Sequence, residues 1–383
     1  MRREPSPPRA DFADEAATIG FTFASASGEA YWNEGARWVF SLDEIESLIE
    51  TAAKELHALS FEVVDRVVGD EEALTRLAIP RHAWDLIYES WLRGDPSLYG
   101  RFDFGYDGKG PPKLLEYNAD TPTSLYEAAV VQWRWLEQGI DRGFLPKGAD
   151  QFNSLHERLI DRWRAIGEGN LLHLACLTRE EEDRGTLAYL EDCARQAGLE
   201  TQSLDMAAIG FDGSRFYDPN RRLIRRLFKL YPWEWMFADD FGRTPAMRKT
   251  LFVEPPWKSI LSCKGALALL WKHVPNHPNL LPCYFEDDPS APSLASYARK
   301  PLYSREGANI ELVSRSARLK GPDGGYGAEG FVRQQMFDLP TFDGVHPVLG
   351  CWIVGDSPAG MGVREDPGLI TTNRSQFVPH MIA

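Results

Sequence analysis

The chain has 383 residues, of which 43% are hydrophobic and 26% charged, and its formal net charge is −14 at pH 7. This composition is typical of a globular protein with one large domain or two interleaved ones. The acidic balance argues against a nucleic-acid partner, because a polyanion is bound by a basic surface. No apolar run approaches the length of a membrane span. The five cysteines are scattered without a CxxC pair, so we expect reduced thiols in a cytoplasmic protein.

The N-terminal segment and two helices come first along the chain. Residues 1–11 are rich in Pro and Arg, and we expect them to form a disordered or loosely docked arm. Ser41 and Glu44 have the spacing of a capping box, which predicts a helix that runs to about Leu59. A second helix is expected at about residues 80–92, where Gly and Pro residues follow it.

A predicted hairpin at about residues 98–120 carries the most informative polar residues. Arg101 and Asp103 lie two residues apart on its first strand, and Glu116 and Asn118 lie two apart on its second. Residues i and i+2 of a strand point to the same face. If the two strands pair, we expect the two carboxylates and the amide to converge.

The chemistry of these side chains favours a magnesium site. Two carboxylates and a carbonyl oxygen are hard ligands that suit Mg²⁺. Phosphoryl transfer from ATP uses such a metal together with an arginine that stabilises the transferring group. The alternative is that Arg101 and Asp103 form a surface ion pair and that Glu116 is a solvated strand residue.

A second helix start follows the hairpin directly. Ser124 and Glu127 again have capping-box spacing, which predicts a helix from there to about Glu137. The N-terminus of this helix would favour a nearby anion. Thr121 and Thr123 lie at that end.

The middle of the chain alternates between helical and strand patterns. A strand, a helix and a second strand in succession predict a parallel pair within an α/β layer. The expected helices lie at about residues 153–166 and 185–197, and the expected strands at about 171–177, 200–204 and 223–230.

The last third reads as an antiparallel sheet. Its strands are expected at about residues 280–286, 297–303, 309–314, 331–337 and 347–354.

Three features of this part suit a nucleotide. Lys300 on a strand, and Lys264 at the start of a helix, can reach phosphate oxygens. The tight turn that holds Glu306 and Gly307 can present backbone N–H groups to the same phosphates. Gln335 ends a strand whose backbone could bind an adenine edge.

At this point the sequence resembles the synthetase domain of the glutathionylspermidine synthase family. The segments that carry the resemblance are RFDFGYDG (101–108), KLLEYNADTPTSL (113–125), CKGALALLW (263–271), ARKPLYSREGANI (298–310), FVRQQMF (331–337) and WIVGDSPAGMGVREDPGLITTNRSQFVPH (352–380). The resemblance implies one ATP-grasp synthetase domain over residues 12–383, with a pre-ATP-grasp-like α/β layer and an antiparallel sheet as a lid. It also implies an ATP-dependent acid–amine ligase that forms an amide through an acyl phosphate.

The resemblance further implies roles for individual residues. Arg101 would stabilise the transferring phosphoryl group, and Arg364 would approach the reacting centre. The ligands of Mg²⁺, expected as two ions, would be Asp103, Glu116 and Asn118. The residues that would bind ATP are Arg101, Phe102, Asp103, Lys264, Lys300, Glu306, Gly307, Gln335, Leu369, Ile370 and Thr371. Those near the substrates would be Thr121, Thr123 and Glu182.

The resemblance leaves the substrates open. The partners it implies are a small carboxylate and a small amine, for which glutathione or a peptide and a polyamine are candidates. The amidase domain of the family has no match in the sequence, so no hydrolytic half-reaction is expected. Ser304 stands where the family pattern suggests glycine. Two alternatives remain: an ATP-binding module without ligase activity, and a phosphotransferase.

Overall fold

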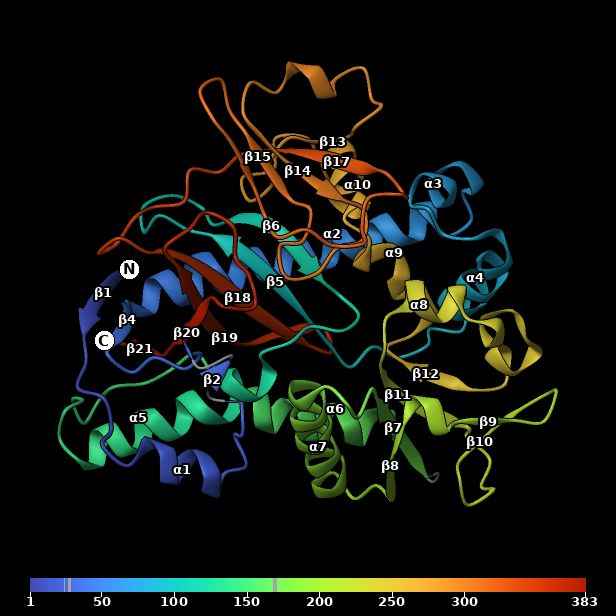
Figure 1. Cartoon of the computed structure of the whole chain (residues 1–383), viewed down its shortest axis with the longest axis horizontal. Coiled ribbons are helices and arrows are strands. Elements are labelled where there is room, and N and C mark those ends of the chain that lie inside the picture. Colours follow the sequence, from blue (N-terminus) through green and yellow to red (C-terminus); the bar gives the residue numbers. More distant parts are fainter. Residues whose placement is uncertain (24, 27–28, 168–170) are drawn as a thin grey trace.

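The structure is a computed structural model that describes residues 1–383 except residue 24, residues 27–28 and residues 168–170. It has a mixed α/β fold in which three sheets of four or five strands dominate (Figure 1). We call them the central sheet, the α/β layer and the lid sheet. The expected fold class is confirmed.

The central sheet joins parts of the chain that are far apart in sequence. Its strands, in spatial order, are β20 (Gln376–Val378), β19 (Ser357–Asp366), β18 (His346–Val354), β5 (Tyr99–Gly105) and β6 (Lys113–Asn118). All neighbours are antiparallel, and β5 lies between β6 and β18. The predicted hairpin is therefore confirmed.

The placement of β18 differs from the expectation that it belongs to the antiparallel sheet of the last third. Most of its side chains are buried, on both faces of the strand. A strand of this kind needs neighbours and cover on both sides, and the central sheet supplies them. Its apolar residues belong to two hydrophobic cores, which share the central sheet.

The α/β layer is parallel throughout, as the strand–helix–strand pattern predicts. Its strands, in spatial order, are β12 (Leu251–Val253), β11 (Arg226–Leu230), β7 (Leu172–Cys176) and β8 (Thr201–Asp205). The crossover from β7 to β8 is α7 (Glu181–Gln196), which begins four residues before the expected start at about residue 185. The layer lies beside the central sheet in Figure 1.

The lid sheet is antiparallel and covers one end of the central sheet (Figure 1). Its strands, in spatial order, are β13 (Cys283–Phe285), β17 (Phe331–Gln335), β14 (Tyr297–Pro301), β15 (Glu311–Val313) and β16 (Arg318–Lys320). The helix α10 (Gly265–His273), which packs against β13 and β17, begins directly after Lys264 as predicted.

The expectation of a disordered arm over residues 1–11 is wrong. The strand β1 (Arg2–Pro5) pairs with β4 (Ala36–Phe40), and β21 (His380–Ile382) pairs with the other side of β4. Arg9 is buried and donates from Nε to Oε1 of Glu34 at 3.0 Å. Composition suggests disorder here, but backbone pairing and this buried ion pair fix the segment.

The first capping box is confirmed, since Ser41 and Glu44 exchange hydrogen bonds between side chain and backbone. The other helices and helical turns are α1 (Phe12–Thr18), η1 (Glu44–Glu50), α2 (Thr51–Val67), α3 (Glu71–Arg76), η2 (Arg81–Ala83), α4 (Trp84–Leu92), η3 (Glu127–Val131), α5 (Gln132–Asp141), α6 (Leu155–Ile166), η4 (Met206–Ala208), α8 (Trp233–Ala238), η5 (Asp240–Arg243), η6 (Pro245–Arg248), η7 (Pro256–Lys258), α9 (Ser259–Ser262) and η8 (Ala291–Ser293). The short strands are β2 (Ser25–Ala26), β3 (Glu29–Ala30), β9 (Gly210–Phe211) and β10 (Phe216–Tyr217).

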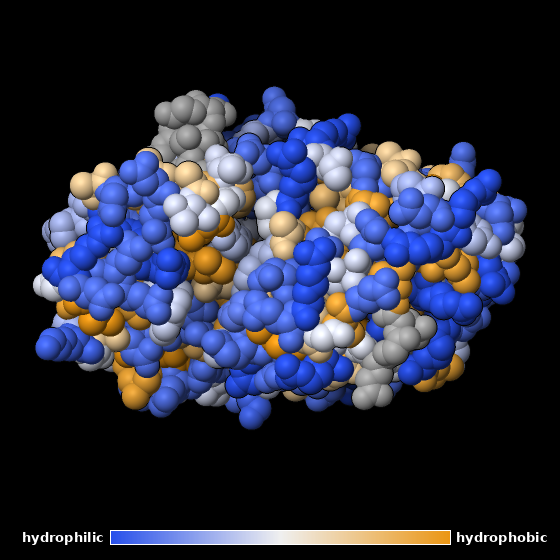
Figure 2. Space-filling view, turned by 90° about the horizontal axis from the view of Figure 1, so that it is seen from below, coloured by the Kyte–Doolittle hydropathy of each residue, from blue (hydrophilic) through white to orange (hydrophobic). Residues whose placement is uncertain are grey.

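The surface agrees with the charged composition. On the face shown in Figure 2, hydrophilic side chains predominate and apolar ones occur in small scattered groups. Among the described residues, every helix is too short or too polar to cross a bilayer.

Candidate active site

A cavity of about 410 Å³ lies where the central sheet meets the lid sheet. Its walls come from β5, β6 and β19 on one side and from β14, β15 and β17 on the other. The predicted site residues that line it are Arg101, Asp103, Glu116, Asn118, Thr121, Thr123, Lys300, Glu306, Gly307, Gln335, Arg364, Leu369, Ile370 and Thr371. The structure therefore brings together most of the residues that the sequence singles out.

The pairing of β5 with β6 sets the polar end of this cavity. Asp103 lies opposite Glu116, and Arg101 lies opposite Asn118. The amide nitrogen Nδ2 of Asn118 donates to Oδ2 of Asp103 at 3.1 Å. The convergence predicted from the i, i+2 spacing is confirmed, and the ion pair between Arg101 and Asp103 is buried rather than at the surface.

Arg101 is buried and holds Asp103 with two hydrogen bonds. Its Nε lies 2.6 Å from Oδ1, and its Nη2 lies 3.0 Å from Oδ2. Its Nη1 donates to the backbone carbonyl of Thr123. Arg364 reaches the same carboxylate, with Nη2 at 3.2 Å from Oδ2. Gly350 permits this arrangement, because a Cβ there would lie 2.8 Å from Cδ of Arg101.

These two arginines keep Asp103 ionised. Burial by itself would raise the pKa of this carboxyl group, because a charge is poorly solvated in the interior. The charge and hydrogen bonds of Arg101, helped by Arg364, outweigh burial and lower the pKa of Asp103 below its ordinary value. The carboxylate is therefore available as an anion at neutral pH.

Two lysines lie at the lid side of the same cluster. Nζ of Lys264 lies 2.6 Å from Oε1 of Glu116 and donates to the carbonyl of Ser304 at 2.8 Å. Nζ of Lys300 donates to the carbonyl of Leu115 at 2.7 Å. Burial lowers the pKa of Lys300 to about 8, although Glu116 opposes this shift.

The donor atoms can be tested against the expected Mg²⁺. Hard oxygen atoms, which suit this ion, are available on neighbouring positions of β5 and β6, from Asp103, Glu116 and Asn118. Here the carboxylates contact Arg101, Arg364 and Lys264. Among the described residues, no group of three or more His, Cys, Asp or Glu side chains is arranged to hold a metal. The set therefore fits Mg²⁺ only together with further oxygen atoms, such as those of a bound phosphate group and of water.

The apolar part of the cavity was missed in the sequence. It combines side chains from three strands and two loops, so no local pattern identifies it. The residues are Ala298, Ile310, Leu312, Met336, Phe337, Leu339 and Val348. Gly105 shows how tightly this wall is packed, since a Cβ there would lie 2.4 Å from the ring of Phe337.

The turn at Gly307 needs glycine for two reasons. Its φ is +73°, a region that other residues rarely adopt. A Cβ at this position would also lie 2.7 Å from the carbonyl oxygen of Thr371. The turn and the segment around Thr371 therefore close one wall of the cavity together.

Three predicted residues lie outside the lining. Phe102 is fully buried in the core and stacks on Tyr117 with ring centroids 4.0 Å apart, because it points to the opposite face of β5 from Arg101. The side chain therefore does not reach the cavity, and the role of Phe102 in binding ATP stays a prediction that would involve its backbone. Lys264 does not line the cavity itself, but it forms an ion pair with Glu116, which does. Glu182 lies in the first turn of α7 and accepts a hydrogen bond from the backbone of Ser124.

Arg305 is a lining residue that the sequence analysis overlooked, although it directly precedes Glu306. Its Nη1 donates to Oγ1 of Thr121 at 2.8 Å, and its Nη2 lies 3.1 Å from Oε1 of Glu234. It thereby links the lid to the end of β6 and to the α/β layer.

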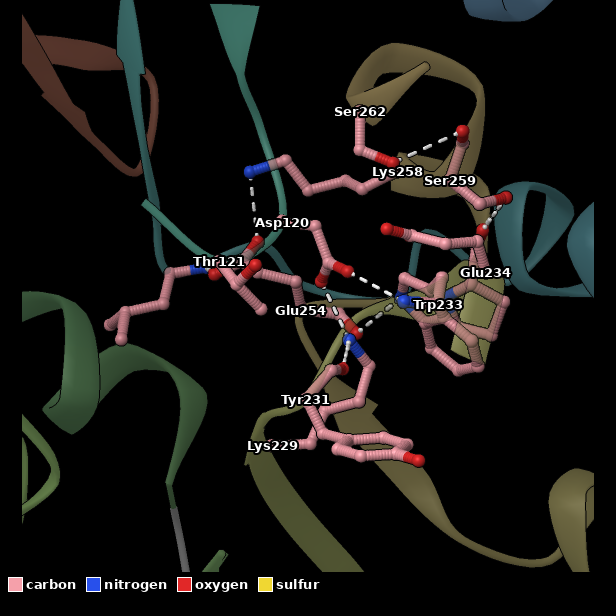
Figure 3. A network of polar contacts seen from close by, with 12 residues as sticks. Asp120, Thr121, Lys229, Tyr231, Trp233, Glu234, Glu254, Lys258, Ser259 and Ser262 are labelled. Atoms are coloured by element: carbon pink, nitrogen blue, oxygen red, sulfur yellow. Dashed lines mark hydrogen bonds and ion pairs between the residues drawn. The ribbon is translucent and has the colours of Figure 1, made fainter. Parts of the chain in front are cut away.

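The residue before Thr121 anchors the same loop from the other side. Figure 3 shows the carboxylate of Asp120 pointing toward Lys229 and the main chain of Trp233. The distances are 2.6 Å to Nζ of Lys229 and 2.9 Å to the backbone nitrogen of Trp233. Both charged groups are buried. The loop that carries Thr121 and Thr123 is thus fixed to the α/β layer.

The second predicted capping box is wrong. Ser124 has φ of +68°, and its backbone hydrogen bond goes to Glu182. Glu127 instead accepts a hydrogen bond from the hydroxyl group of Tyr31 at 2.6 Å. The helix itself is confirmed, as η3 followed by α5.

Comparison with known proteins places the chain in a family. The profile described as "Glutathionylspermidine synthase preATP-grasp" matches residues 3–383. A protein of Haemophilus influenzae named "Putative acid--amine ligase" is 41% identical over 98% of this chain and 97% of its own length.

Two longer relatives match as well. Trypanothione synthetase of Crithidia fasciculata is 29% identical over 84% of this chain, which spans 53% of that protein. The bifunctional glutathionylspermidine synthetase/amidase of Escherichia coli is 26% identical over 96% of this chain, which spans 63% of it.

A solved structure shares the fold. The glutathione synthetase-like effector GSS30 of Globodera pallida superposes with a TM-score of 0.52 over 90% of this chain and 88% of its own, at 12% identity. This likeness concerns the fold alone. The resemblance seen in the sequence is confirmed by the profile and by the Haemophilus relative, and the chain belongs to the glutathionylspermidine synthase preATP-grasp family.

Proposed function

We propose that this chain is an ATP-dependent acid–amine ligase that forms a carbon–nitrogen bond. The observation that carries the proposal is the convergence of Arg101 and Arg364 on one carboxylate at the mouth of a nucleotide-sized cavity. An arginine pair beside two lysines suits a transferring phosphoryl group, because it meets negative charge as that charge develops. The names of the relatives support the same class of reaction.

The proposed reaction has two steps. The substrate carboxylate attacks the γ-phosphorus of ATP, and ADP leaves as the acyl phosphate forms. The amine then attacks the acyl carbon, loses a proton and expels phosphate. Arg101 and Arg364 would hold the phosphoryl oxygens through both steps, because each presents N–H donors toward the point where Asp103 lies.

ATP would bind with its base in the apolar part of the cavity and its phosphates at the cluster of charges. Lys264, Lys300 and the turn with Glu306 and Gly307 would contact the phosphates. Gln335 and the segment 369–371 would enclose the rest of the nucleotide. We propose two Mg²⁺ ions, which would be held by Asp103, Glu116 and Asn118. These ions would neutralise the negative charge of the phosphates.

The two other substrates would enter from the α/β layer. In parallel sheets, ligands bind outside the carboxyl ends of the strands where the chain changes direction across the sheet. Here β7 continues to β8 on one side and the chain then returns to β11 on the other. Thr121, Thr123 and Glu182 border this region, so we place the acid and the amine there.

The substrate pair that we propose first is glutathione with a polyamine, because the relatives are named for these compounds. The five cysteines are free and buried, which is compatible with a reducing cytoplasm.

The test is release of ADP from Mg²⁺-ATP in the presence of a matrix of carboxylates and amines that includes glutathione with spermidine. Mass spectrometry then identifies the product. We expect one acid–amine pair to stimulate ADP release and to yield the condensed mass. A stable phosphorylated acid without amide would indicate a phosphotransferase, and ATP binding without turnover would indicate a binding module.

Glu116→Gln is the matched variant for this test. It keeps the shape of the side chain but removes the charge, so we expect Mg²⁺-dependent turnover to be lost. Turnover at the rate of the unsubstituted protein would remove Glu116 from the metal site.

A further inference from the structure

A buried polar cluster lies behind the loop that carries Thr123. The hydroxyl group of Tyr31 donates to Oε1 of Glu127 at 2.6 Å and lies 3.4 Å from Oγ of Ser124. Glu127 is fully buried, and its second oxygen, Oε2, has no hydrogen-bond partner among the described residues. A buried carboxyl group with an unpartnered oxygen is costly, and helix capping does not account for it.

Ser124 connects this cluster to the active site. Its φ of +68° is unusual for a residue other than glycine. Because of this conformation, its N–H faces Glu182 while the preceding carbonyl, that of Thr123, accepts a hydrogen bond from Nη1 of Arg101. The backbone at Ser124 therefore determines where one end of the guanidinium is held.

We propose that Tyr31 and Glu127 are positioning residues of the ligase, which hold Ser124 in its left-handed conformation so that the Thr123 carbonyl orients Arg101. The inference rests on the proposed function, since it takes Arg101 as the residue that meets the phosphoryl group. Neither Tyr31 nor Glu127 lines the cavity. Their effect on the reaction is transmitted through two hydrogen bonds and one backbone turn.

Electrostatics support the arrangement. Burial, followed by the charge of Glu182, raises the pKa of Glu127 to about 8. The groups that act on it are Tyr31 from the segment before β4, Glu182 from α7 and Arg101 from β5. The helix α6 also packs against η3, and its buried residues are apolar apart from the indole N–H of Trp163. At neutral pH the carboxyl group is thus protonated, and it accepts from Tyr31 without adding charge beside Glu182.

The first test compares Tyr31→Phe with Tyr117→Phe. The hydroxyl group of Tyr117 is also buried but has no hydrogen-bond partner among the described residues, and its ring packs in the core. We expect Tyr31→Phe to lower kcat about 10- to 100-fold, because small displacements of a catalytic group reduce the rate strongly. The Kd of ATP should stay within about twofold, and Tyr117→Phe should leave both unchanged. Equal kcat values for the two variants would overturn the proposal.

The second test uses Glu127→Gln, which resembles the protonated side chain. We expect this variant to match the unsubstituted protein at pH 7. As the pH rises through about 8, kcat of the unsubstituted protein should fall as Glu127 ionises beside Glu182, whereas the variant should not show this fall. A fall of the same size in both proteins would count against a role for Glu127.

A readout that needs no ligase activity separates this inference from the proposed function. Hydrogen–deuterium exchange of a peptide over residues 119–126 should be faster in Tyr31→Phe than in Tyr117→Phe. Unchanged exchange would overturn the inference even if the protein is a ligase. Exchange could also be faster in Tyr31→Phe although the protein shows no turnover with any acid–amine pair. This result would support the role of Tyr31 in holding the loop but contradict the proposed ligase activity.

Discussion

Two clusters of charged side chains differ in what surrounds them. The site cluster consists of Arg101, Asp103, Glu116, Lys264 and Arg364. The interlayer cluster, which is drawn in Figure 3, consists of Asp120, Lys229, Glu254 and Lys258. Both pair lysine or arginine with carboxylates at hydrogen-bond distance.

The interlayer cluster is sealed. Lys229 donates to Asp120 and also to the carbonyl of Tyr231 at 3.0 Å. Lys258 donates to Glu254 at 2.9 Å and to Oγ of Ser97 at 2.8 Å. These charged groups are buried and balanced, two cations against two carboxylates.

The site cluster faces a cavity. Four of its five residues line the open space. An anion such as a phosphate can therefore replace the internal partners of its cations. Charges that are fully enclosed with their partners hold the layers together, whereas paired charges that border a cavity are accessible to a ligand.

The largest expected effect is on the sealed cluster. Lys229→Met leaves Asp120 as a buried charge without its cation, which we expect to lower the free energy of unfolding by about 3–5 kcal/mol. Urea denaturation followed by circular dichroism measures this. If Lys229→Met loses activity while its free energy of unfolding is unchanged, Lys229 acts as part of the site, and the two clusters do not differ in the way described.

The next effect is on the site cluster. Arg101→Lys keeps a positive charge but loses the paired donors, so we expect kcat to fall about 10²- to 10³-fold. The unfolding free energy should change far less than in Lys229→Met. A kcat equal to that of the unsubstituted protein would show that the bidentate geometry has no role in the reaction.

The pH dependence of ATP binding tests one further cation beside the cavity, Lys300. Burial lowers the pKa of Lys300 to about 8, so its charge is present at pH 7 and is lost as the pH rises above 8. We expect the Kd of ATP to increase by up to about tenfold between pH 7 and pH 9, since one phosphate contact loses its charge. Calorimetric titration of Lys300→Arg, which stays charged, should show a much flatter profile. If the Kd of ATP depends on pH in the same way in both proteins, Lys300 is not the group whose loss of charge weakens ATP binding.

The smallest effect is expected for an exposed pair. Arg164 donates to Asp161 at 2.6 Å, but both side chains are largely exposed. We expect Arg164→Ala to change neither kcat nor the unfolding midpoint measurably, because such pairs contribute little. A marked loss of stability would show that an exposed ion pair can contribute as much as a buried one, and burial would then not explain the stability effect expected for Lys229→Met.

Local patterns were sufficient for much of the fold. The hairpin with Arg101 and Glu116 was found from alternation and turn residues, and the parallel pair of the α/β layer from its strand–helix–strand order. Family resemblance then supplied residues such as Arg364 that no spacing would connect to Asp103. Most of these residues do line one cavity.

The errors share a physical cause, since they all concern contacts between distant segments. The pattern of β18 identifies a strand but not which sheet it joins. Composition at residues 1–11 does not reveal pairing with β4. The spacing of Ser124 and Glu127 matches a capping box, yet Tyr31 and Glu182 take the hydrogen bonds. Arg305 was overlooked because its partners lie in other layers.

The central sheet has a consequence for synthesis of the protein. Its strands β5 and β6 leave the ribosome long before β18 and β19, which complete the sheet. Until His346–Asp366 has emerged, the nascent chain lacks Gly350 beside Arg101 and lacks Arg364 altogether. Contacts between such distant segments form slowly because a long loop must close first. The proposed nucleotide site is therefore complete only after His346–Asp366 has been made, and a shorter nascent chain lacks part of it.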